Sequence, residues 1–334
     1  MKPLVILDPL FRRMEQLFGP AELSALHNAA EVAWGRDGDM PEAEIAKCRD
    51  RAAAVICGYW KHGSPNDYPN LKAIIEVGGQ HPSPKSLDYA ACFARGIHVL
   101  SCAPGFGPAV AEMALALTLG CTRTVVETDR RFRDGSERWE FVETQESFSL
   151  YDQPVGFIGF GGLARNLKSL LDPFRCRIRA HDPWLPDSSL REQGVAPAGL
   201  EAVLAESKVI FVLAIPSPEN RGLLNRRRLE LIQPGSVLIL ISRAHLVDFD
   251  ALTECVHAGR FRAGIDVFPE EPLPRDHPIR KAPLAVLSSH KAGAMAEAMR
   301  LIGKWTVEDL VAILNGEAPR RLQPARPDIV SRMG

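Results

Sequence analysis

The segment VGFIGFGGLARNL, residues 155–167, constrains the fold more than any other part of the chain. An apolar stretch leads into Gly159-x-Gly161-x-x-Ala164, and a helical pattern follows. In a strand–turn–helix unit the first glycine permits the tight turn, and the second lets backbone amides approach a pyrophosphate. The third position needs a small residue so that the helix can pack on the strand. The pattern alone is weak, since a glycine-rich turn can be purely structural.

Asp182 strengthens the case for a dinucleotide site, because it follows the next predicted strand 21 residues after Gly161. An acidic side chain at this place accepts hydrogen bonds from ribose hydroxyls and repels a 2′-phosphate. The sequence therefore predicts NAD as the cofactor in preference to NADP. The local sequence also allows the alternative that the Asp-Pro pair only forms a turn.

From Pro154 onward, strand-like and helix-like segments alternate regularly. Such alternation predicts a parallel sheet covered on both faces. The strand-like segments are 155–158, 177–181, 208–213, 236–241, 263–267 and 284–288. Helical stretches between them include 161–171 and 248–258, and a final helix is predicted over 295–314, before Asn315-Gly316.

The part before residue 103 predicts a smaller α/β layer, with short apolar runs at 4–7, 53–56, 73–77 and 97–100. Residues 108–127 predict one long helix with Pro108 near its start. A loop is predicted over 133–154. The tail at 318–334 is rich in Pro and Arg, and we expect it to be loose or packed on a neighbour.

Composition limits the class of protein. The 334 residues suffice for about two domains at ~150 residues each. Lys plus Arg total 40 and Asp plus Glu total 41, which gives no electrostatic case for binding nucleic acid or a membrane surface. The longest apolar runs fall short of the ~18 residues that span a bilayer, and Asp8-Pro9 interrupts the start too early for a secretion signal.

The seven cysteines are scattered, odd in number and without a CxxC pair. They predict thiols of a cytoplasmic protein, with neither zinc nor disulfides implied.

Four motifs together resemble the D-isomer-specific 2-hydroxyacid dehydrogenases, including the phosphoglycerate dehydrogenase-like and the hydroxypyruvate or glyoxylate reductase-like enzymes. Their order and spacing match the family, and the likeness covers about residues 50–322. They are GFIGFGGLA, ISRAHLVDFDAL (241–252), AGIDVFPEEPLP (263–274) and VLSSHKAGA (286–294). Further matching stretches are LKAIIEVGG (71–79), RGIHVLSCAPG (95–105) and AVAEMALAL (109–117).

The resemblance implies two Rossmann-like α/β domains. An NAD-binding domain with a doubly wound parallel sheet, residues 103–294, is inserted into a flavodoxin-like substrate domain made of residues 1–102 and 295–334. The active site is expected in a cleft at the carboxyl ends of the strands. By the same resemblance, residues 108–150, with the Trp139 loop, form the surface of a homodimer.

Three residues match the family's catalytic groups. Arg243 matches the substrate arginine, whose guanidinium fork suits a carboxylate. His290 matches the general acid/base, a role that histidine side chains fill near neutral pH. Glu271 matches the carboxylate that orients the imidazole and favours its charged form. Each could instead be structural: a surface arginine, an acidic Pro-Glu-Glu-Pro turn, and a histidine at a strand end.

The remaining site predictions also follow from the resemblance. Asp266 matches a position beside the nicotinamide, and the backbone amides around Gly78-Gly79 match the loop that holds the substrate carboxylate. The predicted cofactor-binding residues are Gly159, Phe160, Gly161, Gly162, Leu163, Asp182, Ala214, Ile215, Pro216, Ile241, Ser242, Asp266 and Gly293. The predicted substrate-binding residues are Gly78, Gly79, Tyr59 and Arg243. No metal is implied. Two further residues have open roles. Trp60 either forms a wall of the cleft or only packs, and His245 either reaches the cleft or plays no part in it.

The chain departs from the family pattern in several places. The segment 78–88 is about three residues longer than the usual substrate loop and lacks its acid, so substrates such as 3-phosphoglycerate are poorly supported. The other departures are Leu240 for Asn, Ala244 for Gly, Ser288-Ser289 for Thr-Pro, and a 215–222 segment about one residue shorter with Asn220 for Thr.

The sequence thus predicts an NAD-dependent oxidoreductase that moves a hydride to or from the C2 atom of a small 2-keto or D-2-hydroxy acid. An NAD(H)-sensing regulatory protein of the same fold without turnover is the alternative. A related dehydrogenase for a phosphonate or formate is a third possibility. The particular acid, the direction of reaction and a strict coenzyme preference are not defined by the sequence.

Overall fold

The chain divides into two units, which are described separately here. One comprises Met1–Gly107 with Ala294–Gly334, and the other Pro108–Gly293. The structure is a computed structural model that describes residues 2–139 and 147–332. The junctions predicted from the sequence were 102/103 and 294/295.

The first unit is built on a sheet with the strand order β13-β5-β4-β3-β1-β2. Strands β1 to β5 run parallel, whereas β13 pairs antiparallel with β5. All residues of β1, β3 and β4 are buried, as expected for parallel strands covered on both faces. The bounds are β1 Leu4–Asp8, β2 Glu31–Trp34, β3 Ala52–Cys57, β4 Ala73–Glu76, β5 His98–Ser101 and β13 Gln323–Pro324.

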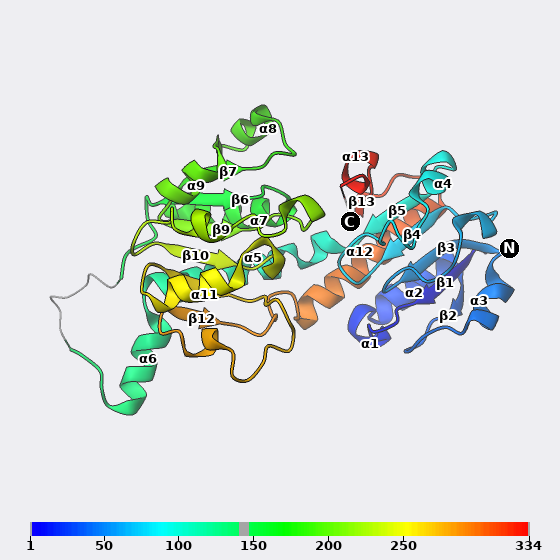
Figure 1. Cartoon of the computed structure of the whole chain (residues 1–334). Coiled ribbons are helices and arrows are strands. Elements are labelled where there is room, and N and C mark those ends of the chain that lie inside the picture. The colour runs from blue at the N-terminus through cyan, green and yellow to red at the C-terminus, as the bar shows by residue number, and fades with distance from the viewer. Residues whose placement is uncertain (1, 140–146, 333–334) are drawn as a thin grey trace. The chain divides into compact units, whose positions relative to one another are not determined.

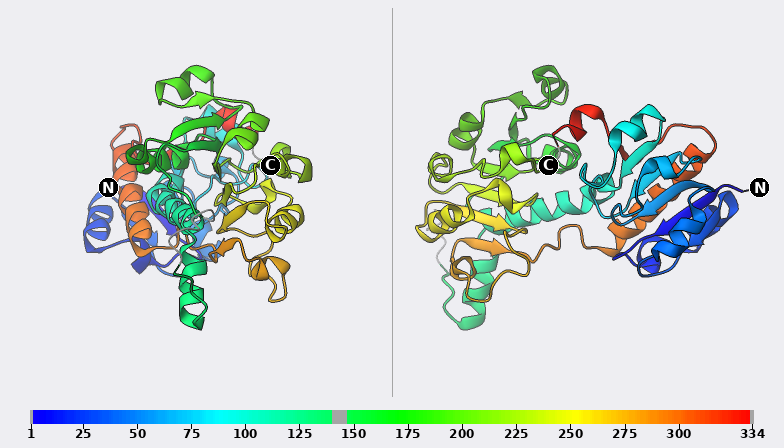
Figure 2. Two further views of the ribbon diagram at one scale, coloured as in Figure 1. Left: turned by 90° about the vertical axis from the view of Figure 1, so that its left-hand side faces the viewer. Right: turned by 45° about the vertical axis from the view of Figure 1, so that its right-hand side comes forward.

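The long helix α12 (Ala296–Leu314) returns the chain to this first unit and packs on α1 and α2 (Figures 1 and 2). The approach is close at Gly303, where an added Cβ would lie 1.8 Å from the Leu17 carbonyl oxygen. The other helices of the unit are α1 Met14–Leu17, α2 Pro20–Ala29, α3 Glu42–Cys48, α4 Tyr89–Ala94 and α13 Pro327–Val330.

The C-terminal tail is bound to its own unit, so the first of its two predicted states, a loose tail, was wrong. The Asp309 carboxylate on α12 accepts hydrogen bonds from the backbone amides of Arg320, Arg321 and Leu322. These bonds direct residues 323–324 onto the free edge of β5. A buried carboxylate on another element, which no local pattern indicates, therefore orders the tail.

The second unit has a wholly parallel sheet in the order β12-β11-β10-β9-β6-β7-β8, and the two sheets confirm the predicted α/β fold class. The order reverses between β6 and β9, where doubly wound sheets bind ligands. The strands are β6 Pro154–Ile158, β7 Arg177–His181, β8 Ala196–Pro197, β9 Val209–Val212, β10 Val237–Leu240, β11 Arg262–Ile265 and β12 Ala285–Leu287.

Hydrophobic clusters cover both faces of this second sheet. Along β9, Ile210 and Val212 belong to one cluster, whereas Val209 and Phe211 belong to the other. This alternation follows from the two-residue period of a strand. The covering helices include α7 Gly162–Leu171, α8 Asp187–Glu192, α9 Leu200–Glu206, α10 Arg226–Leu229 and α11 Phe249–His257.

The helix predicted over 108–127 is two helices, α5 (Ala103–Thr122) and α6 (Val125–Asp134). Thr124 separates them with a left-handed backbone, φ 53°, and Pro108 lies inside α5 instead of at its start. By length and composition, with a mean hydropathy of 1.2, α5 would suffice to cross a membrane. This is weak evidence, because residues such as Ala114 and Leu117 pack into the hydrophobic cluster of the second unit.

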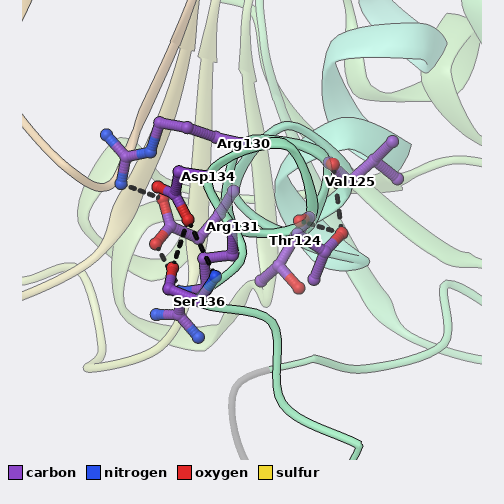
Figure 3. A network of polar contacts seen from close by, with 8 residues as sticks. Thr124, Val125, Arg130, Arg131, Asp134 and Ser136 are labelled. Carbon is purple, nitrogen blue, oxygen red and sulfur yellow. Dashed lines mark hydrogen bonds and ion pairs between the residues drawn. The ribbon is translucent and has the colours of Figure 1, made fainter.

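Among the described residues, the side-chain hydrogen bonds of helix α6 stay within residues 124–136, and none of its residues is buried (Figure 3). Glu127 pairs with Arg130 and Arg131, and the Asp134 carboxylate accepts from Ser136. Of the segment predicted as a dimer surface, residues 140–146 lie outside the described residues.

Candidate active site and cofactor site

The glycine turn lies at the carboxyl end of β6, where the strand order of the second sheet reverses. Gly159 has a φ of +90°, and an added Cβ would lie 2.6 Å from the Cα atom of Ala214, which follows β9. Gly161 and Gly162 differ, because an added Cβ would meet nothing within 4 Å at either position. Open space therefore borders the N-terminus of α7, as a pyrophosphate requires.

Asp182 closes this turn against the end of β7. Its carboxylate accepts hydrogen bonds from the backbone amides of Phe160 (2.7 Å) and Trp184 (2.9 Å). A carboxylate has about four acceptor positions, so ribose hydroxyls can still bind. The Phe160 ring is fully buried and stacks on Phe157, so this predicted cofactor residue faces the core.

A hollow of about 480 Å³ opens beside Asp182, at the end of the sheet where an adenosine would bind. Its other lining residues come from the loops around β7 and β8. They are Ala180, His181, Pro183, Leu185, Asp187, Leu190, Pro197, Ala198 and Gly199.

Two buried serine hydroxyls also suit a polar cofactor. Ser217 follows β9 and Ser242 follows β10, and neither Oγ atom has a hydrogen-bond partner among the described residues. Buried polar atoms are rarely left unpaired, so a bound nicotinamide nucleotide could satisfy them. Ser242 was predicted, whereas Ser217 was missed. Its only signal is its place directly after Pro216.

The other predicted cofactor residues occupy the same edge of the second sheet with varied exposure. Ile215 is exposed and Ile241 is buried. Leu163, Ala214, Pro216 and Gly293 are partly buried.

His290 and Glu271 form a close pair. Nδ1 of His290 lies 2.6 Å from Oε2 of Glu271, and Oε1 of Glu271 accepts from the Phe268 amide at 3.0 Å. No described residue hydrogen-bonds to Nε2 of His290, and the histidine side chain is 41% exposed. One ring nitrogen is therefore fixed and the other is available to a reactant.

The electrostatics keep Glu271 ionised. Partial burial alone would raise its pKa, but several favourable interactions outweigh it and lower the pKa overall. These are the hydrogen bond with His290, the Phe268 amide, and the charges of His290 and Arg243. A carboxylate held in this form accepts from Nδ1 and so orients the imidazole.

Asp266 holds the backbone directly after His290. Its fully buried carboxylate accepts from the amides of Lys291 (2.9 Å) and Ala292 (3.1 Å). His290 itself has a left-handed backbone, φ 54°, a conformation that is uncommon for residues other than glycine. The structure therefore places Asp266 as a support for the His290 turn.

Arg243 follows β10 and lies within electrostatic reach of Glu271. Its Nη1 donates to the Ser242 carbonyl at 2.7 Å. Burial lowers the pKa of Arg243, and the charge of Glu271 opposes that effect. Burial also lowers the pKa of His245, together with the charges of Arg221 and Arg243, so His245 is a poor proton carrier.

The predicted substrate-binding residues Tyr59, Gly78 and Gly79 lie in the first unit. Tyr59 is 50% exposed, whereas Trp60 is buried and its indole donates to the Gly63 carbonyl, so Trp60 serves packing. The amides of Gly78 and Gly79 are already bonded within the unit, as described below. Among the described residues, no group of three or more His, Cys, Asp or Glu side chains could hold a metal ion.

A parallel sheet with a glycine turn, an acid after the second strand and a histidine–carboxylate pair at the same edge define an NAD-binding oxidoreductase domain. More narrowly, residues 115–292 match the family described as D-isomer specific 2-hydroxyacid dehydrogenase, NAD binding domain. The chain belongs to this family.

Known relatives are similar over most of this chain. A glyoxylate reductase of Thermofilum pendens is 30% identical over 315 residues, covering 90% of each chain. A D-3-phosphoglycerate dehydrogenase of Mycobacterium tuberculosis is 28% identical over 89% of this chain but only 56% of its own length. The chain thus spans about half the length of the first curated relatives that it matches. The crystal structure of a phosphoglycerate oxidoreductase from Rhizobium etli superposes with a TM-score of 0.85, at 34% identity, covering 97% of this chain and 99% of that one.

Two glycine substitutions separate folding from cofactor binding. We expect Gly159→Ala to lower the Tm and cost about 2 kcal/mol or more, since it adds a clash with backbone at a positive φ. Gly161→Ala should keep the wild-type Tm but weaken NADH binding about tenfold or more, because its methyl group fills the space for the pyrophosphate. Thermal unfolding and NADH fluorescence titration check both; equal Tm losses would contradict the assignment.

Proposed function

We propose that this protein transfers a hydride between NAD(H) and the C2 atom of a small 2-keto or D-2-hydroxy acid. The observation that carries the proposal is the 2.6 Å pair of His290 and Glu271, located at the cofactor-binding edge of the second sheet. The names of two relatives, a glyoxylate reductase and a phosphoglycerate oxidoreductase, support the same substrate class.

In the reducing direction, NADH would supply the hydride to C2 when bound. Arg243 binds the substrate carboxylate through its guanidinium fork and polarises the adjacent carbonyl. His290 then donates the proton from Nε2 to the oxygen on C2, which completes the hydroxyl group. Glu271 holds Nδ1 and stabilises the charged imidazole before the transfer. In the oxidising direction, the neutral imidazole accepts the same proton.

For the cofactor, we propose that the amides around Gly161 hold the pyrophosphate and that Asp182 binds the adenosine ribose. The carboxylate of Asp182 would repel a 2′-phosphate, which favours NAD over NADP. Ser217 and Ser242, with their unpaired hydroxyls, would face the nicotinamide half.

The direct test is NADH oxidation with a panel of 2-keto acids that vary in their distal group, repeated with NADPH. We expect turnover with at least one small 2-keto acid and a higher kcat/KM with NADH. NADH binding without turnover across the panel would instead favour an NAD(H)-sensing protein. The panel also identifies the preferred acid.

We further propose that the protein is a cytoplasmic homodimer and that α6 contributes to its interface. Val125, Val126 and Phe132 on this helix are 52–62% exposed, and the Trp139 ring lies against Phe132. Clustered exposed apolar side chains of this kind mark association surfaces.

Phe132→Glu is expected to shift the protein from dimer toward monomer in sedimentation velocity, because it places a charge in the apolar patch. Leu170→Glu on α7 is the control, since Leu170 is exposed outside the patch. A dimer unaffected by Phe132→Glu would exclude α6 from the interface.

A further inference from the structure

Glu76, the last residue of β4, binds three consecutive backbone amides of the segment that follows. Its Oε1 accepts from the Gly78 amide at 2.8 Å, and its Oε2 accepts from the amides of Gly79 (3.0 Å) and Gln80 (2.8 Å). Successive amides that point to one centre form an anion-binding concavity. In this protein a side chain of the chain itself, 5% exposed, occupies that concavity.

Other contacts hold the same loop, residues 78–88, from outside the concavity. Arg12 Nη2 donates to the Gly78 carbonyl at 3.2 Å. The Tyr89 hydroxyl donates to the Pro82 carbonyl at 2.6 Å, and His81 Nε2 lies 2.9 Å from the Gln323 carbonyl oxygen. The loop is therefore ordered within its own unit, and the amides of Gly78 and Gly79 both donate to Glu76 in this structure.

Burial and the neighbouring polar groups have opposite effects on the ionisation of Glu76. Burial raises the pKa of its carboxyl group to about 7, although the three amides and the charge of Arg12 act in the opposite direction. The other titratable groups that face it are Cys57, Cys102 and Tyr89, and burial raises the pKa of each of these, so they are neutral. Arg12 is thus the charged group among the neighbours of Glu76.

We propose that Glu76 is a positioning residue for the substrate loop, whose ionised carboxylate holds the amides of Gly78, Gly79 and Gln80 and so fixes the loop for substrate binding. The ionised form accepts all three hydrogen bonds, whereas the protonated form carries a donor that opposes an amide N–H. The loop consequently loosens when Glu76 takes up a proton near neutral pH. The effect of this loop on substrate binding rests on the proposed function.

Hydrogen–deuterium exchange of the peptide that spans the loop tests this without any turnover. Glu76→Gln keeps the size of the side chain but replaces one acceptor with a donor. We expect about tenfold faster exchange in Glu76→Gln than in wild type at pH 8, with the difference shrinking toward zero at pH 6. Asp88→Asn is the matched control, since Asp88 caps α4 at the other end of the loop and leaves the concavity intact.

Kinetics provide the second measurement, with the acid that the panel identifies. The KM of Glu76→Gln should exceed the wild-type KM about tenfold at pH 8, and the ratio should approach one at pH 6. Equal ratios at both pH values, in exchange and in KM, would show a purely structural residue and overturn the proposal. If no acid is turned over, the exchange result still decides the role of Glu76, so the two proposals fail separately.

Glu76→Ala, tested with added acetate, distinguishes loss of the carboxylate from a failure to fold. It leaves the amides of Gly78, Gly79 and Gln80 without this acceptor, so sodium acetate should restore loop protection and raise the Tm more than sodium chloride of equal ionic strength. Rescue by acetate supports an anion-binding concavity. Wild-type exchange in Glu76→Ala without acetate would contradict it.

Discussion

His290→Ala is expected to lower kcat by about 10²–10⁴-fold while NADH affinity stays nearly unchanged. The substitution removes the proposed proton donor, whose Nδ1 lies 2.6 Å from Glu271, but it leaves the glycine turn and Asp182 in place. Without a positioned acid, the alkoxide that forms on hydride transfer must take its proton from water. Steady-state kinetics and NADH titration measure the two effects.

His257→Ala is the matched control, because His257 is exposed at the end of α11 and its Nε2 lies 3.0 Å from the Pro278 carbonyl oxygen. It should retain wild-type kcat. A His290→Ala enzyme with undiminished turnover would remove His290 from the mechanism. A loss of NADH affinity as large as the loss of kcat would assign it to cofactor binding.

Arg243→Ala should reduce kcat/KM for the 2-keto acid by about 10²–10⁴-fold, because a bidentate guanidinium–carboxylate contact contributes two charged hydrogen bonds. Arg243→Lys restores the charge but not the planar fork, so only part of the activity should return. We expect the loss mainly in KM if the arginine binds the carboxylate alone, and in kcat as well if it polarises the carbonyl.

Arg221→Ala tests whether any neighbouring cation would serve. Arg221 is exposed, and its charge lowers the pKa of His245, as the charge of Arg243 does. We expect less than about a threefold change in kcat/KM, as for a screened surface charge. If the two alanine variants lose activity equally, the effect is one of local charge, and the specific contact assigned to Arg243 is wrong.

Continuous apolar runs were sufficient to predict most of the fold. Strands such as β3 and β9 are buried along their whole length and can be recognised from their apolar composition. By contrast, β8 and β13 have two residues each, and no periodicity is detectable over that length. The break between α5 and α6 depends on the backbone of Thr124, which no apolar pattern reveals.

The site shows the same division between local and distant information. Gly159 and Asp182 lie in a recognisable spacing, and the motifs predicted the pair of Glu271 and His290 that the structure brings to 2.6 Å. The hydrogen bonds by which buried carboxylates hold backbone amides near the site were not predicted. Asp266 binds amides 25 and 26 residues away along the chain, so its contacts depend on tertiary structure.

The route of the chain has a consequence for its synthesis. The second unit is one continuous segment, Pro108–Gly293, whereas the first unit lacks α12 and the edge strand β13 until residues 294–334 have left the ribosome. Domains fold as units once their segments are available. We therefore expect the dinucleotide-binding unit to finish folding first, although its first residue is translated after β1 to β5. The sheet of the first unit should complete its fold only after residues 294–334 are available.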